Sequence, residues 1–112
     1  MHSKCLECEI SALTKAILPK MIDSNSGFIV NIGSTAGKEV YRNGNVYCAS
    51  KFAVNALNKS MRLDLNEYNI RVAGIHPGLV ETEFSDVRFK GDKARAKTVY
   101  QGYKALQAED IA

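Results

Sequence analysis

The feature that most constrains the fold is a pair of short apolar runs on either side of a long stretch without Gly or Pro. Residues 28–32 and 70–75 are short, apolar and rich in β-branched side chains, a pattern typical of strands buried on both faces. Residues 46–68 place apolar side chains at helical spacing. Strand, helix and strand in this order predict one βαβ unit with parallel pairing and a right-handed crossover. The predicted fold class is therefore α/β, with a parallel sheet.

The flanking segments predict fewer regular elements. A helix is expected over residues 10–22, ended by a turn of small polar residues at 23–27. After the second strand, residues 79–92 form an irregular, charged loop that is longer than ordinary connections, so we expect it to serve a function. A polar helix is expected over 93–104, and residues 108–112 read as the start of a further helix.

Composition excludes several classes of function. The 112 residues carry 15 Lys plus Arg and 12 Asp plus Glu, and the resulting charge of +3 is scattered, so no nucleic-acid partner is expected. No stretch approaches the roughly 18 apolar residues of a membrane span, and we expect a cytoplasmic protein without a membrane partner. Cys5 and Cys8 have CxxC spacing, but no second ligand pair accompanies them, so no metal site is predicted. Cys48 is expected to be a small buried residue.

The candidate chemistry lies where the two strands end. In open parallel sheets, ligands bind beyond the carboxyl ends of the strands. Tyr47 and Lys51 are four residues apart at the start of the predicted helix, which places them on one face. A neighbouring ammonium stabilises a tyrosine phenolate, and Ser34 at the first strand end can hydrogen-bond a substrate oxygen. These three residues predict an acid/base site for an alcohol or a ketone.

A second pair with the same spacing carries less information. Tyr100 and Lys104 are also four residues apart, but Val87 stands thirteen residues before Tyr100, whereas Ser34 stands thirteen before Tyr47. We therefore interpret Tyr100 and Lys104 as a solvated helix face.

A serine hydrolase is excluded on sequence. Its nucleophile elbow needs Gly two positions before and two positions after the serine. Ile32 and Ala36 occupy those places around Ser34. His76, beside Pro77 at a strand end, is expected to line the cleft rather than to act as a base.

Three motifs together resemble the short-chain dehydrogenase/reductase family. They are Gly27-Phe-Ile-Val-Asn-Ile-Gly-Ser34-Thr-Ala-Gly37, Tyr47-Cys-Ala-Ser-Lys51 and Pro77-Gly78-Leu-Val-Glu-Thr82. The resemblance runs from about Ser11 and implies the second half of a Rossmann-like α/β domain with a doubly wound parallel sheet. It implies that Ser34, Tyr47 and Lys51 are catalytic, and that NADP or NAD is the cofactor. The tyrosine is then the acid/base, and the lysine also holds the nicotinamide ribose. The cofactor-binding residues it implies are Tyr47, Lys51, Pro77, Gly78, Val80 and Thr82.

A narrower likeness concerns the substrate. Residues 45–51, 78–85 and 87–92 look like those of NADP-dependent 3-hydroxy acid dehydrogenases, which act on serine and related 3-hydroxy acids. The resemblance implies hydride transfer between NAD(P) and a small hydroxy acid or carbonyl substrate. Arg88 or Lys90 on the 79–92 loop is then a candidate to pair with a substrate carboxylate, alongside Ser34 as a substrate-binding residue. A solvated loop charge remains the alternative for both.

The chain also departs from the family pattern. It matches the second half only, and no Gly-x-x-x-Gly-x-Gly turn occurs. Residues 1–10 match poorly, and no Asn stands near residues 6–8, where the family has one. We expect residues 1–112 to form one partial, truncated domain that is marginally stable and binds nicotinamide nucleotide weakly, because strands without neighbours expose apolar surface.

Two hypotheses follow for the function. The first is an oxidoreductase in truncated form that works as a homo-oligomer, a dimer or tetramer, through the long helix 46–67. The second is a catalytically dead fragment, or an interaction remnant that pairs with intact subunits through the same helix. Apolar positions on more than one face of this helix suit both a core and a partner.

Overall fold

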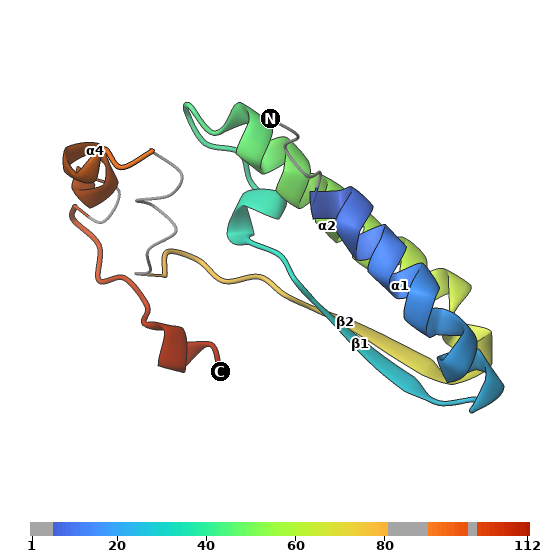
Figure 1. Cartoon of the computed structure of the whole chain (residues 1–112). Helices are drawn as coiled ribbons and strands as arrows, with labels where there is room; N and C mark the ends of the chain where they lie inside the picture. Colours follow the sequence, from blue (N-terminus) through green and yellow to red (C-terminus); the bar gives the residue numbers. More distant parts are fainter. Residues whose placement is uncertain (1–5, 81–89, 99–100) are drawn as a thin grey trace. The chain divides into compact units, whose positions relative to one another are not determined.

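The structure, a computed structural model, describes residues 6–80, 90–98 and 101–112. The chain divides into two compact units, Met1–His76 and Pro77–Ala112, and each is described by itself. The first unit holds two helices and a two-stranded sheet, joined by short 3-10 turns (Figure 1). Its elements in chain order are α1 (Leu6–Asp23), β1 (Gly27–Ile32), η1 (Thr35–Gly37), α2 (Asn45–Asp64), η2 (Asn66–Tyr68) and β2 (Ile70–Ile75).

The sheet is parallel, as expected. β1 and β2 pair with Gly27 opposite Ile70 and Ile32 opposite Ile75. Because α2 connects the two strands, the segment is a βαβ unit and the predicted α/β class is confirmed. The second strand has the predicted bounds, and the first begins one residue earlier than the apolar run.

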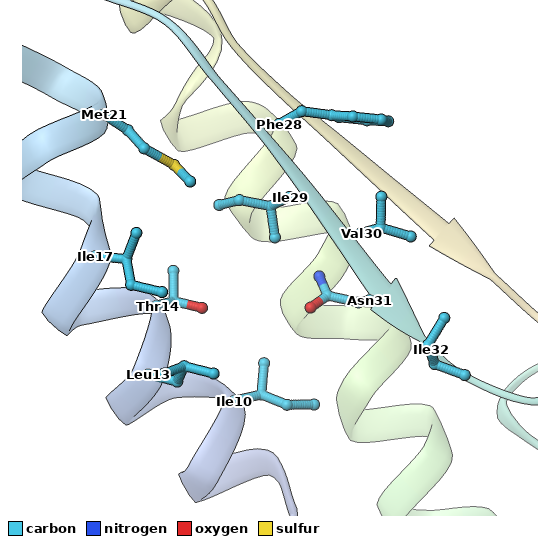
Figure 2. Close-up of a pocket in the computed structure, with 10 residues that line it drawn as sticks. All are labelled: Ile10, Leu13, Thr14, Ile17, Met21, Phe28, Ile29, Val30, Asn31 and Ile32. Atoms are coloured by element: carbon cyan, nitrogen blue, oxygen red, sulfur yellow. The ribbon is translucent and has the colours of Figure 1, made fainter. Parts of the chain in front are cut away.

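The core lies between the two helices and one face of the sheet. Ile29 and Asn31 of β1 point towards the helices (Figure 2). Three core residues are buried, and six partly buried side chains pack around them. The buried residues are Leu65, Ile70 and Val72, and the surrounding ones are Leu18, Met21, Ile22, Ile29, Met61 and Tyr68.

No helix of the described first unit covers the opposite face of the sheet, called the bare face below, where the Arg71 Cζ lies 5.0 Å from the centroid of the Phe28 ring. Phe28, Val30 and Ile32 point away from the helices and are 55%, 43% and 54% exposed (Figure 2). The expectation that this strand is buried on both faces is therefore wrong for this chain. The physical reason is that the core-forming residues of α1 and α2 all pack against the same face. Exposed apolar surface around unpartnered strands was expected, and it is found here.

The helix ends differ from the sequence pattern. α1 begins at Leu6, inside the segment that matches the family poorly. α2 ends at Asp64, four residues before the predicted end, and a 3-10 turn follows. Asn69 adopts a left-handed conformation, φ 56°, and its side chain donates to the Asn25 carbonyl at 3.1 Å. This turn reverses the chain into β2, which a helix continued to residue 68 would not allow.

The second unit contains two short helical segments, α4 (Lys93–Thr98) and η3 (Ala108–Asp110). Val80 and Leu106 form an isolated parallel bridge in which the Leu106 N–H donates to the Leu79 carbonyl at 2.8 Å. The helix predicted over 93–104 is shorter in the structure, and Gly102 has a φ of 81°, which a helix does not accommodate. Within the residues that the structure describes, no helix has the length and apolar character needed to cross a membrane.

Candidate active site

Ser34 stands at the carboxyl end of the sheet. The preceding residue, Gly33, donates its N–H to the Ile75 carbonyl at 2.7 Å, so Ser34 follows the last rung of the ladder. Its side chain is almost fully buried, and its Oγ accepts a hydrogen bond from the Ala36 N–H at 3.1 Å, which caps η1. An accepted bond leaves the hydroxyl hydrogen available as a donor. Ser34 can therefore donate to a substrate oxygen while its Oγ still accepts the hydrogen bond from the Ala36 N–H.

Tyr47 and Lys51 lie on successive turns at the start of α2, and both are half-buried. The Lys51 Nζ lies 5.8 Å from the centroid of the Tyr47 ring. This distance is within the range of a cation–π contact. The structure thus places the ammonium beside the tyrosine ring on one face of the helix.

Two electrostatic features are found at the amino-terminal end of α2. Burial lowers the pKa of the Lys51 ammonium from its usual value, because desolvation penalises the charged form. The amino terminus of α2, where the Cys48 N–H bonds the Gly44 carbonyl at 2.7 Å, carries the positive end of the helix dipole. The Lys51 amine and the amino terminus of α2 both lie close to the turn that carries Tyr47.

A close backbone contact joins the Ser34 loop to the Lys51 turn. A Cβ added to Gly37 would lie 2.5 Å from the backbone carbonyl oxygen of Lys51, so only Gly fits between η1 and α2. Asn55, one turn after Lys51, donates its side-chain amide to the Gly37 carbonyl at 3.1 Å. These contacts bring the loop that carries Ser34 against the helix turn that carries Lys51.

A buried amide pair makes a second tie between β1 and α2. The Asn31 Nδ2 donates to the Asn58 Oδ1 at 3.0 Å, and both side chains are buried. Asn31 lies three residues before Ser34, and Asn58 lies seven after Lys51 on the same helix face. Sequence reasoning missed this pair. The available signal was Asn31 itself, the single polar residue within an apolar strand.

His76 packs between glycines at the strand ends. A Cβ at Gly33 would lie 2.6 Å from the His76 Nδ1, and a Cβ at Gly74 would lie 2.9 Å from its Nε2. The Nδ1 is buried and has no hydrogen-bond partner in the part of the chain that the structure describes. The imidazole therefore fills the space that the two glycines leave below the Ser34 loop.

The remaining predicted residues belong to the second unit. Pro77, Gly78 and Val80 begin it, and their placement is described only within that unit. Thr82 and Arg88 lie outside the described residues. Lys90 is exposed.

The fold and the site together define a class of protein. This is an α/β protein with a parallel βαβ unit, and its polar site lies at the carboxyl ends of the strands. The site consists of a serine at the strand end and a tyrosine–lysine pair on the next helix. Residues 9–93 match the family described as short chain dehydrogenase. The chain belongs to this family, which confirms the family inferred from the three motifs.

Curated relatives show the same kinship over most of the chain. The NADP-dependent 3-hydroxy acid dehydrogenase YdfG of Shigella flexneri is 50% identical over 101 residues, covering 89% of this chain and 41% of the relative. The NADP-dependent 3-hydroxy acid dehydrogenase of Schizosaccharomyces pombe is 46% identical over 101 residues, covering 90% of this chain and 39% of the relative. The chain thus spans about two fifths of the length of these relatives.

Solved structures agree. The closed form of a serine dehydrogenase complexed with NADP+ has a TM-score of 0.81 and 50% identity, and the match covers 88% of this chain and 40% of that one. A gluconate 5-dehydrogenase from Burkholderia cenocepacia, in complex with NADP and tartrate, has a TM-score of 0.72 and 28% identity, covering 88% of this chain and 39% of that one. The chain therefore has the fold of one part of a Rossmann-like dehydrogenase domain.

Proposed function

We propose that this chain carries the acid/base site of an NAD(P)-dependent oxidoreductase that interconverts an alcohol and a carbonyl. The observation that carries the proposal is the placement of Lys51 beside Tyr47, on a helix packed against the loop of Ser34. The relatives named as 3-hydroxy acid dehydrogenases support the same reaction class. Free thiols at Cys8 and Cys48 are consistent with action in the cytoplasm.

The three side chains divide the work of alcohol oxidation. Ser34 donates a hydrogen bond to the substrate oxygen and holds it near Tyr47. The Tyr47 phenolate, stabilised by the Lys51 ammonium, takes the hydroxyl proton as the C–O bond becomes a carbonyl. A nicotinamide nucleotide, held in part by Lys51, would supply the acceptor for the hydride that leaves the substrate carbon. In the reverse direction Tyr47 returns the proton to the oxygen.

The residues present fit a nicotinamide nucleotide. An ammonium carries three donors, and the half-buried Lys51 is suited to hold ribose hydroxyls while it stabilises the phenolate. We assign Pro77, Gly78, Val80 and Thr82 to the nicotinamide as well. NADP is the favoured cofactor, because the similar structures and relatives are named with NADP.

The proposed substrate is a 3-hydroxy acid such as serine. We infer that residues 1–112 form part of a single domain in which 79–92 is the substrate loop. Arg88 on this loop pairs with the substrate carboxylate through its planar fork. The name of the serine dehydrogenase structure supports this choice.

The outer face of α2 supports assembly with a second copy. Ala49, Phe52, Ala56 and Leu63 recur at helical spacing and are exposed, and Leu63 is 80% exposed. Burying such an apolar stripe is favourable. We expect Phe52→Lys to lower the oligomeric state measured by light scattering, and Asp64→Asn, at an exposed position of the same helix outside this stripe, to leave it unchanged.

The function is tested by nucleotide binding and turnover in one preparation. The purified chain is titrated with NADPH by nucleotide fluorescence, and serine oxidation is followed alone and after addition of the remaining part of a family member. We expect Tyr47→Phe to lower turnover at least about hundredfold and to lower NADPH affinity far less. The control is Tyr103→Phe, which alters an exposed tyrosine of the second unit. Turnover that survives Tyr47→Phe, or no turnover in either preparation, would contradict the proposal.

A further inference from the structure

One side of α2 carries the two site residues and a third polar residue. Tyr47, Lys51 and Asn55 recur at intervals of four residues, which places their side chains along one side of the helix. In an α-helix the N–H of residue 55 bonds the carbonyl of residue 51. Asn55 is therefore joined to the Lys51 turn by its backbone, and its half-buried side chain lies on the side of the helix that carries the site.

The Asn55 amide reaches the turn that follows Ser34. Its Nδ2 donates to the Gly37 carbonyl at 3.1 Å, and Gly37 is the last residue of η1. Inside the turn, the Gly37 N–H donates to the Ser34 carbonyl at 2.9 Å. Gly37 thus bonds Ser34 through its N–H and Asn55 through its carbonyl, so one residue connects the serine to the helix.

The position of Ser34 depends on the orientation of η1. The Ser34 Oγ accepts a hydrogen bond from the Ala36 N–H at 3.1 Å, and its carbonyl accepts the bond from Gly37. The side chain is also almost fully buried, so it moves together with the turn. A displacement of η1 along α2 would therefore displace the serine hydroxyl relative to Tyr47.

Two kinds of contact hold η1 on α2, and they act differently. The close approach of Gly37 to the Lys51 carbonyl limits how near the turn can come, but a van der Waals contact has no preferred direction. The hydrogen bond from Asn55 is directional, and it weakens steeply when its geometry is lost. The orientation of the turn on the helix is therefore set by the Asn55 amide.

The Asn55 bond lies at the wall of a groove, which separates its effect on position from its effect on stability. The groove has a volume of about 650 Å³, and both Gly37 and Asn55 line it. A groove of this size admits water, which can bond the Gly37 carbonyl once the amide is removed. Loss of the amide therefore loosens the turn without leaving a buried carbonyl unpaired, unlike loss of the buried Asn58 amide.

We propose that Asn55 is a positioning residue, which holds η1 through the Gly37 carbonyl in the orientation that directs the Ser34 hydroxyl to the substrate oxygen. The proposal rests on the proposed function, because it concerns the same site. Asn55 acts through Ser34 and not on the substrate. A displacement of about 1 Å in a site can lower the rate about a hundredfold, so one hydrogen bond here affects turnover more than stability.

The first measurement is amide hydrogen exchange in the purified 112-residue chain, which needs no turnover. Asn55→Leu keeps a branched side chain of similar size and removes the donor. We expect exchange at the amides of Ala36 and Gly37 to become at least about tenfold faster, because η1 loosens locally. The Leu65 N–H, which bonds the Met61 carbonyl at 3.0 Å after the other end of α2, is the internal reference and should keep the rate of the parent.

The second measurement is turnover in the preparation that contains the remaining part of a family member. We expect Asn55→Leu to lower kcat for serine oxidation at least about tenfold and to change NADPH affinity by less than about twofold. Asn55→Gln keeps the amide donor and should restore most of this rate. Asn66→Leu removes an exposed amide of η2 and should leave kcat unchanged.

A double-mutant cycle with Ser34→Ala separates positioning from a structural role. If Asn55 acts through Ser34, Asn55→Leu has little further effect on kcat once the hydroxyl is absent. A residue that only supports the fold would lower kcat by the same factor in both backgrounds. The proposal is overturned by unchanged exchange at Ala36 and Gly37, or by equal losses of kcat in the two backgrounds. Absence of turnover in every preparation would overturn the proposed function and the assignment of Asn55 to it, whereas the exchange result alone decides whether Asn55 holds η1.

Discussion

At the scale of single residues, the Lys51 ammonium links the proposed chemistry to stability. Burial lowers its pKa in the folded chain below the ordinary value of 10.5. Between the lowered pKa and 10.5 the unfolded chain binds more protons than the folded one, so the free energy of unfolding rises with pH across this window. At neutral pH the buried charge therefore costs stability, and Lys51→Met should abolish the rise.

The measurement is the pH dependence of amine labelling at Lys51, followed by mass spectrometry of its peptide. We expect half-maximal reactivity at a lower pH in the folded chain than in the same chain unfolded by urea. Lys51 in urea is its own control. Equal values in the two states, or a higher value in the folded chain, would contradict the burial argument.

The amide pair of Asn31 and Asn58 gives a second prediction. Asn58→Ala leaves the buried Asn31 amide without its acceptor at 3.0 Å, which should cost about 1–3 kcal/mol in the free energy of unfolding. Ser60→Ala, at an exposed position of the same helix, should change it by less than about 0.5 kcal/mol. Urea unfolding of both variants measures these changes in the free energy of unfolding. A double-mutant cycle with Asn31→Ala isolates the coupling energy between the two amides. A cycle without coupling would refute the pairing.

The sequence identifies some of these residues and misses others for a physical reason. Ser34, Tyr47 and Lys51 could be selected because their chemistry and spacing are local. Asn31 and Asn58 are 27 positions apart, and nothing in either segment shows that they meet across β1 and α2. A contact made by tertiary packing has no signature in local spacing.

At the scale of elements, the junction of η1 and α2 depends on Gly37. Gly37→Ala would place a methyl group 2.5 Å from the Lys51 carbonyl oxygen, and backbone cannot move aside as a flexible side chain can. We expect a loss of about 1–3 kcal/mol from this overpacking, measured by thermal unfolding. Gly78→Ala is the matched control, since its Cβ would meet nothing within 4 Å. Equal stability of the two variants would show that the junction is loose.

Elements were predicted well where periodicity is strong and poorly at their ends. The strands and the long helix follow from apolar spacing, because each buries a face of its own. The end of α2 at Asp64 depends on the burial of Leu65 and on the left-handed turn at Asn69, which serve the return to β2. The apolar helical spacing alone continues to residue 68, so tertiary packing determines that α2 ends at Asp64.

At the scale of the whole molecule, the apolar pattern of β1 is typical of a strand covered on both faces, whereas the described helices cover one face. Phe28, Val30 and Ile32 are predicted to be buried because they belong to a nearly continuous apolar run, yet in the structure they are exposed on the bare face, with Arg71 beside the Phe28 ring. The motifs predicted membership and partial coverage correctly, and the match to about two fifths of each relative accords with them. Sequence reasoning could not tell which face stays open, since both faces of β1 carry β-branched apolar side chains and the polar Asn31 lies on the covered one.

The bare face also sets the behaviour of the chain in solution. Replacing Val30 and Ile32 together by Thr keeps β-branched side chains and the backbone pairing, so the free energy of unfolding should change by less than about 1 kcal/mol. Exposed apolar area falls, and we expect weaker binding of an apolar fluorescent dye and less light scattering at high concentration. Val72→Thr, which puts a hydroxyl into the core instead, should cost about 1–3 kcal/mol and leave the bare face unchanged. If the Val30 and Ile32 double variant aggregates as much as the parent, association must arise from another surface, and the apolar stripe of α2 and the exposed Leu13 and Ile17 of α1 are the next surfaces to test.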